Sequence, residues 1–264
     1  MTDTFPFEEL RQLLEKARTA DAELKQFGAK DHKYQWNPPA ALSDVEEFER
    51  ELGVTLPEGY RDFLLQAGDG GAGPFYGLFS LKQVRGWLGW PLEPEKPPVL
   101  RPGMSKVERD EEKNWKRGCI PIESQGDTYF TCLLMTGLDR GRVVYIEYEG
   151  SWVFFPREPD FLSWYTRWLR DTGNGYQRIG WFATDLAGDE ESLHRHYQCA
   201  ESKEEQWLAI ISMEKFPALS SKSVELIRTA MADRMTMPDA RGVLELLHRT
   251  GIDQWFLEWR WEAG

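Results

Sequence analysis

Apolar residues near the start of the chain recur with the spacing of a helix. Positions three, four and seven residues apart share one face of an α-helix. Pro6 suits a first helical turn, where its missing N–H is not needed. A helix is therefore predicted from Phe5 to Phe27, with an apolar face that consists of Leu10, Leu13, Leu14, Ala17 and Leu24.

Two further helices are predicted after the extended segment that Pro38-Pro39 enforces. Ser43 is a suitable N-cap, and Glu46, three residues later, would complete a capping box. Gly53 is suited to end the first helix in the left-handed conformation. The apolar stripes are Val45, Phe48 and Leu52 in the first helix, and Tyr60, Phe63 and Leu64 in the second, which ends at Gly68.

From Phe75 the pattern changes to short segments between glycines and prolines. Leu92 to Gly103 holds several prolines and predicts a long loop. Segments rich in β-branched and aromatic residues predict strands, and Asp160 is a suitable N-cap for a helix that closes this region. The strands are predicted at 120–122, 128–135 and 142–148, with weaker candidates at 77–81 and 151–156.

The segment TGNGYQRIGW, residues 172–181, predicts a domain boundary, because almost everything after it has helical periodicity. The short connections suit antiparallel stacked helices. We therefore expect an α+β domain with a mixed or antiparallel sheet and packed helices, followed by an all-α C-terminal module. The expected limits are 1–33 for an N-terminal helix, 34–174 for the domain and 175–264 for the helical module, whose helices are predicted at 190–200, 203–216, 221–234, 239–249 and 253–261.

The chain of 264 residues carries a formal net charge of −12 and is rich in aromatic residues, 13% with 12 Trp. Such charge repels nucleic acid and anionic membrane surfaces and attracts a basic protein. Acidity that only maintains solubility is an equally good explanation. Aromatic residues stabilise cores and interfaces alike, so their abundance fits a binding protein without proving one.

Three cysteines without metal-type spacing imply no disulfide framework. The N-terminal segment lacks the basic and apolar regions of a signal peptide, and no apolar run approaches the ~20 residues of a membrane span. We expect a cytoplasmic protein that requires no cofactor.

The middle of the chain resembles the SUKH superfamily (the Smi–Knr type). An acidic helix with a central Phe-Glu is followed by a Leu-Pro segment, aromatic residues and an Asn-Gly-Gly-like turn. Later a Gly-Asp-x-Tyr strand, a Gly-x-Val-Tyr strand and a closing Phe-Leu helix recur. The matching residues, between Tyr34 and Asp171, are Phe48-Glu49, Gly53, Leu56-Pro57, Tyr60, Phe63-Leu64, Gly68 to Gly71, Gly126 to Tyr129, Gly141 to Tyr145 and Phe161-Leu162 to Trp168-Leu169.

The resemblance implies a binding scaffold, because no residue of the motif is a nucleophile or a paired acid and base. Bacterial members are mostly linked to neutralising toxins, often nucleases, and eukaryotic relatives look like regulatory adaptors. Asp69 replaces the usual Asn, a mild departure because both residues tolerate turn geometry.

Three kinds of chemistry are disfavoured. Gly68 to Gly73 resembles a phosphate loop, but such loops follow a strand, whereas this one follows a helix. His194 and His196 would point roughly 200° apart on a helix, so they could not share a metal ion. None of the four histidines lies in a recognisable catalytic motif.

Two groups of residues are candidates for contact with a protein partner. Phe75 and Tyr76, with Trp87 and Trp90 nearby, resemble aromatic interface anchors, although they could equally cover the sheet edge. Strand-associated carboxylates could meet a basic partner, although a solvated sheet face is the simpler explanation. The predicted partner-binding residues are Asp69, Phe75, Tyr76, Trp87, Glu123, Asp127, Glu147 and Glu149. Trp255, Phe256 and Trp259 suit a core or a dimer contact.

We therefore predict a non-catalytic protein that binds a basic toxin domain tightly and neutralises it. The alternative is a regulatory adaptor for a housekeeping partner.

Overall fold

The computed structural model describes residues 7–149, 152–176 and 182–232, except the side chains of 231 and 232. The chain divides into two compact units, Met1–Asn174 and Gly175–Gly264, which we describe separately.

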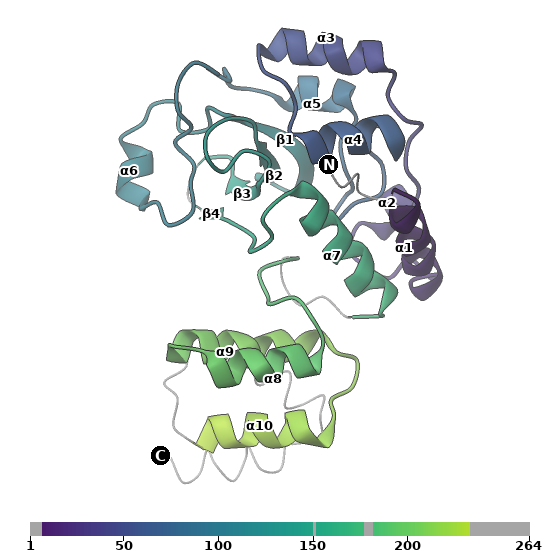
Figure 1. The fold of residues 1–264 in the computed structure, drawn as a ribbon, viewed down its shortest axis with the longest axis vertical. Helices are drawn as coiled ribbons and strands as arrows, with labels where there is room; N and C mark the ends of the chain where they lie inside the picture. The colour runs from purple at the N-terminus through teal and green to yellow at the C-terminus, as the bar shows by residue number, and fades with distance from the viewer. Residues whose placement is uncertain (1–6, 150–151, 177–181, 233–264) are drawn as a thin grey trace, which may run out of the picture. The chain divides into compact units, whose positions relative to one another are not determined.

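Unit 1 combines helices with one antiparallel sheet (Figure 1). The strands follow one another in space in the order β1-β2-β3-β4, so each pairs with its neighbour in the sequence. The helices are α1 (Phe7–Ala20), α2 (Ala29–His32), α3 (Leu42–Leu52), α4 (Glu58–Gln66), α5 (Leu81–Trp87), α6 (Lys106–Asp110) and α7 (Phe161–Gly173). The strands are β1 (Cys119–Gly126), β2 (Tyr129–Leu134), β3 (Val143–Glu147) and β4 (Val153–Phe154).

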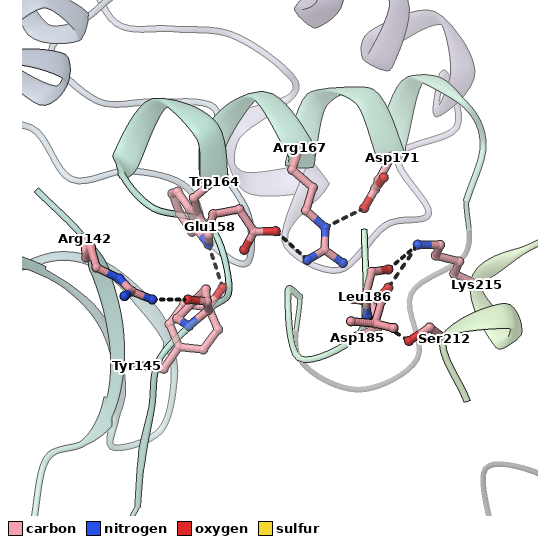
Figure 2. A network of polar contacts seen from close by, with 11 residues as sticks. Arg142, Tyr145, Glu158, Trp164, Arg167, Asp171, Asp185, Leu186, Ser212 and Lys215 are labelled. Atoms are coloured by element: carbon pink, nitrogen blue, oxygen red, sulfur yellow. Dashed lines mark hydrogen bonds and ion pairs between the residues drawn. The ribbon is translucent and has the colours of Figure 1, made fainter. Parts of the chain in front are cut away.

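Helix α7 packs on the sheet through aromatic side chains that are also polar at one end. Trp164 Nε1 donates a hydrogen bond of 2.8 Å to the Tyr145 hydroxyl on β3 (Figure 2). Tyr165 contacts the Phe63 ring of α4, with ring centroids 4.9 Å apart. All four side chains are fully buried. The Tyr165 hydroxyl donates to the Ala72 carbonyl at 2.7 Å, so both the Trp164 and the Tyr165 donors of α7 are satisfied and favour one position of the helix.

Helices α3 and α4 form as a pair, but α3 begins earlier than predicted. Ala41 is its N-cap, and the amides of Asp44 and Val45 bond to the Ala41 carbonyl. Ser43 therefore lies inside the first turn, where its hydroxyl cannot cap the helix, and the predicted capping box is wrong. The left-handed end at Gly53 is confirmed, with φ of 70°.

The Gly-Gly turn after α4 holds three segments together. Gly71 forms isolated β-bridges with Trp36 and with Leu78. A Cβ atom on Gly71 would lie 2.6 Å from the Gln35 carbonyl oxygen, and one on Gly70 would lie 2.6 Å from the Leu78 carbonyl oxygen. Only glycine permits this approach.

Other predicted elements differ from the structure. The first helix ends at Ala20 rather than Phe27, because the Asp21 carboxylate accepts the Lys25 and Gln26 amides and turns the chain. Residues 77–81 form bridges rather than a strand, and α5 follows directly, with a capping box at Ser80 and Gln83. In the segment 151–156, β4 comprises two residues.

The described part of unit 2 is helical: α8 (Glu190–Cys199), α9 (Lys203–Ser212), the 3₁₀ turn η1 (Met213–Lys215) and α10 (Ser221–Ala232). Trp207, Ile210 and Ile227 belong to its own apolar core. Helix α9 ends before the predicted Phe216. The helices predicted at 239–249 and 253–261, with Trp255, Phe256 and Trp259, lie outside the described residues.

The α+β class with a helical C-terminal part is therefore confirmed. Among the helices of the described ranges, none has both the length and the apolar character needed to cross a membrane.

Candidate partner-binding surface

Exposed aromatic side chains of unit 1 lie in two pairs beside the hairpin that β1 and β2 form. Strand β1 ends at Gly126, which pairs with Tyr129 at the start of β2. Asp127, at the tip, is exposed and has φ of 53°, a conformation that Asp tolerates in turns. We call Phe27, Tyr76, Trp87, Asp127, Tyr148 and Glu149 the hairpin-tip surface.

One side of the turn is covered by Tyr76 and Phe27. A Cβ atom on Gly126 would lie 3.2 Å from Tyr76 Cε2, so the tyrosine ring rests against the turn. The Phe27 ring meets the Tyr76 ring edge-on, with centroids 5.0 Å apart. Phe27 is 56% exposed and Tyr76 45% exposed, so water reaches much of this pair.

Trp87 and Tyr148 form a second aromatic group that adjoins the same turn. The Tyr148 amide donates to the carbonyl of Thr128, the residue after Asp127, at 2.8 Å. The buried Phe130 ring lies 5.4 Å from the Trp87 ring and 6.2 Å from the Tyr148 ring. Trp87 also stacks on Phe79, with 6° between the ring planes. Trp87 is 51% exposed and Tyr148 39% exposed.

Lys116 fixes the position of Tyr148. Its ammonium nitrogen lies 3.6 Å from the Tyr148 ring centroid and donates to the Tyr148 carbonyl at 3.0 Å. The same nitrogen lies 5.1 Å from the Trp90 ring. Burial lowers the pKa of the Lys116 ammonium. A cation held against aromatic faces orders the rings before a partner arrives.

The predicted acidic group is divided by burial. Glu123 is fully buried and accepts from the Thr131 hydroxyl at 2.8 Å. Glu147 is buried and accepts from the Glu149 amide at 3.1 Å. Because β3 ends at Glu147, Glu149 lies beyond the strand, where it is exposed, as is Asp127. Of these four carboxylates, Asp127 and Glu149 are open to a partner.

Two other predicted residues are engaged within the fold. Phe75 is buried, and its ring meets the Tyr145 ring edge-on at 5.9 Å. The Asp69 carboxylate accepts from the Leu81 amide at 2.7 Å, at the start of α5. Burial raises the pKa of Asp69, while the hydrogen bond from Leu81 opposes that shift. In this structure Phe75, Glu123 and Glu147 present almost no surface for contact.

The structure thus leaves Tyr76, Trp87, Asp127 and Glu149 of the predicted set exposed at or beside the hairpin of β1 and β2, and it adds Phe27 and Tyr148. The sequence predicts Phe27 at the end of a helix and Tyr148 in a strand. No feature of the sequence marks either residue as exposed.

His194 of α8 serves the packing of unit 2. His194 is buried and its Nε2 atom lies 2.8 Å from the Ser223 hydroxyl on α10. Burial lowers the pKa of His194, so the neutral ring is favoured. Within the described ranges, no group of three or more His, Cys, Asp or Glu side chains is placed to hold a metal ion.

The fold and this surface define an α+β domain that presents exposed aromatic residues beside a β-hairpin. Residues 39–167 match the SMI1/KNR4 family (SUKH-1). This part of the chain therefore belongs to the SUKH superfamily, which confirms the resemblance found in the sequence. No curated protein matches the chain closely enough to count as a relative.

Proposed function

We propose that this chain is a non-catalytic immunity protein that neutralises a basic toxin domain in the bacterial cytoplasm, and that it binds the toxin through the hairpin-tip surface. The observation that carries the proposal is the presence of two pairs of partly exposed aromatic rings, Phe27 with Tyr76 and Trp87 with Tyr148, beside one β-hairpin. Apolar ring surface in contact with water is unfavourable unless a partner covers it. Aromatic residues also contribute much of the binding free energy at protein interfaces.

Charge supports the same partner. Asp127 and Glu149 are exposed at the hairpin turn and just after β3, and the chain carries a net charge of −12. A negative surface accelerates encounter with a basic domain, while the desolvated rings determine how long the complex lasts. Membership of the SUKH superfamily supports a binding role, because that family is linked to toxin neutralisation in bacteria.

The test uses as its probe any basic C-terminal domain of a large secreted protein that a search of the neighbouring genes finds. We expect the purified chain and that domain to elute together in size-exclusion chromatography, and the chain to suppress killing of cells that express the toxin. Trp87→Ala and Tyr148→Ala should each weaken binding by about 30-fold, the effect of losing about 2 kcal/mol at an interface centre.

Leu138→Ala is the matched control. Leu138 is a fully exposed apolar residue in the loop after β2, at the opposite end of that strand from the hairpin turn. It should bind like the unchanged chain. If all three variants bind the toxin as tightly as the unchanged chain does, and have its unfolding midpoint, the hairpin-tip surface is not the interface. If the toxin kills cells equally with and without the chain, immunity to that toxin is excluded.

The second candidate function is a regulatory adaptor. It is favoured by unit 2, which has an apolar core of its own and could carry a separate partner. Affinity purification from the native host separates the two functions: recovery of a secreted toxin's C-terminal domain supports immunity, and recovery of a housekeeping protein supports the adaptor.

A further inference from the structure

A positively charged cavity lies within unit 1 of this acidic chain. It has a volume of about 500 Å³, within the range of about 300–1,000 Å³ of pockets that hold small organic ligands. Five basic side chains line it: Arg101, Lys106, Arg109, Arg142 and Arg157. None of the described residues that line the cavity is Asp or Glu. The cavity therefore favours an anion, although the chain as a whole repels one.

Part of this positive charge is not neutralised by neighbours. Within the described ranges, no ion pair involves Lys106 or Arg157. Arg142 lies 3.4 Å from Asp139 and donates through Nη2 to the Pro156 carbonyl at 3.1 Å. Its Nε atom is buried and makes no hydrogen bond within the described part of the chain. A buried donor without an acceptor is costly, and an oxygen of a bound anion would satisfy it.

The other wall of the cavity is aromatic. The rings of Trp152 and Phe154 stack with 5° between their planes and centroids 5.9 Å apart. The Phe155 ring lies 5.8 Å from the Arg142 guanidinium carbon. All three side chains are partly exposed. Flat rings beside guanidinium groups suit a ligand that has both a flat ring and a phosphate.

We infer that this cavity binds a mononucleotide, with the phosphate at Arg142 and Arg157 and the base against the aromatic wall. A polymeric nucleic acid is disfavoured, because a polyanion would extend beyond the cavity over a surface of net negative charge. The site is independent of the proposed function, since none of the hairpin-tip residues lines the cavity.

The experiment is isothermal titration calorimetry of the full chain with adenosine 5′-monophosphate, adenosine and inorganic phosphate as separate ligands. We expect saturable binding of the nucleotide and binding at least about tenfold weaker for each half alone, because each half forgoes one set of contacts. Equal binding of inorganic phosphate, or tighter binding of a short oligonucleotide, would overturn the assignment of a mononucleotide.

Variants locate the site. Arg142→Met should weaken binding of the nucleotide by about tenfold, the effect of losing a charge-assisted hydrogen bond. Replacing Arg142 also removes its hydrogen bond to the Pro156 carbonyl, which could disturb the fold. Arg157→Gln is therefore a second variant, at an exposed position. Arg18→Gln on α1 is the control, since it removes the same charge from an exposed side chain that is not part of the cavity. The site would be refuted if all three variants bound the nucleotide as tightly as the unchanged chain does. It would also be refuted if the unchanged chain showed no saturable binding.

Discussion

Asp69 stands where the family usually has asparagine, and it makes a hydrogen bond that preserves the local fold. Its Oδ1 atom accepts the Leu81 amide at 2.7 Å, where α5 begins. An asparagine could make the same hydrogen bond, since it also offers an oxygen acceptor. The aspartate differs in charge, and burial raises its pKa above the ordinary value of 3.8, with Asp44 also raising it.

This raised pKa gives a prediction for Asp69→Asn. The folded state holds the Asp69 proton more tightly than the unfolded state does. Folding stability contributed by this group is therefore present below pH ~4 and is lost as the pH rises through the folded-state pKa. We expect Asp69→Asn to be at least as stable as the unchanged chain at pH 7 and to show a smaller loss of stability between pH 4 and 7, measured by urea unfolding across that range.

Asp69→Ala is the comparison for the hydrogen bond. It removes the acceptor as well as the charge, and we expect it to lower the free energy of unfolding by about 1 kcal/mol, as for the loss of a helix cap. A lower stability of Asp69→Asn at pH 7 would contradict this account.

Adjacent residues also show why the site could be predicted only in part. Phe75 and Tyr76 have the same pattern in the sequence, yet Phe75 is buried against Tyr145 and Tyr76 is exposed beside Phe27. Phe75 also has a positive φ of 49°, a conformation that its residue type does not predict. Likewise Glu123 is buried, and its Oε2 atom accepts from the hydroxyl of Thr131, eight residues away in the sequence. Such contacts between distant segments leave no local pattern.

At the scale of elements, the periodic helices could be predicted and the short ones could not. Helices α3 and α7 each bury an apolar stripe that repeats over about two turns or more, and α4 buries three apolar residues within its nine. Helix α5 has seven residues, of which Leu81 and Val84 are buried. Two apolar positions do not define a period, so packing and the Ser80 cap determine this helix.

Helix α7 carries a buried charge that provides the next prediction. Arg167 lies 2.7 Å from Glu158 and 3.3 Å from Asp171, and all three side chains are at most 14% exposed (Figure 2). Removing the guanidinium leaves two carboxylates with little water. We expect Arg167→Ala to lower the free energy of unfolding by about 3 kcal/mol, measured by chemical denaturation.

Arg18→Ala on α1 is the control for the loss of an ion pair. Arg18 pairs with Glu15 at 2.7 Å, and both side chains are more than half exposed. Its replacement should change stability by no more than about 0.5 kcal/mol. If the two substitutions lowered the free energy of unfolding equally, the contribution of the Arg167 ion pairs to stability would not depend on their burial.

At the scale of the whole molecule, each unit contains an apolar core. Among the residues that the structure describes, the largest fully buried side chains, from Leu10 to Trp168, belong to unit 1. Unit 2 has a separate cluster that includes Trp207, Ile210 and Ile227. A domain that contains its own core can in principle fold alone.

A chain that ends at Asn174 should therefore fold on its own. We expect it to unfold in one cooperative transition and to keep a near-ultraviolet circular dichroism signal, because the packed rings of Tyr145, Trp164 and Tyr165 remain in place. It also retains every residue of the hairpin-tip surface, so under the proposed function it should still neutralise the toxin. A fragment that folds but does not protect cells would place part of the toxin contact on unit 2. A fragment without a cooperative transition would show that the core of unit 1 does not suffice for folding.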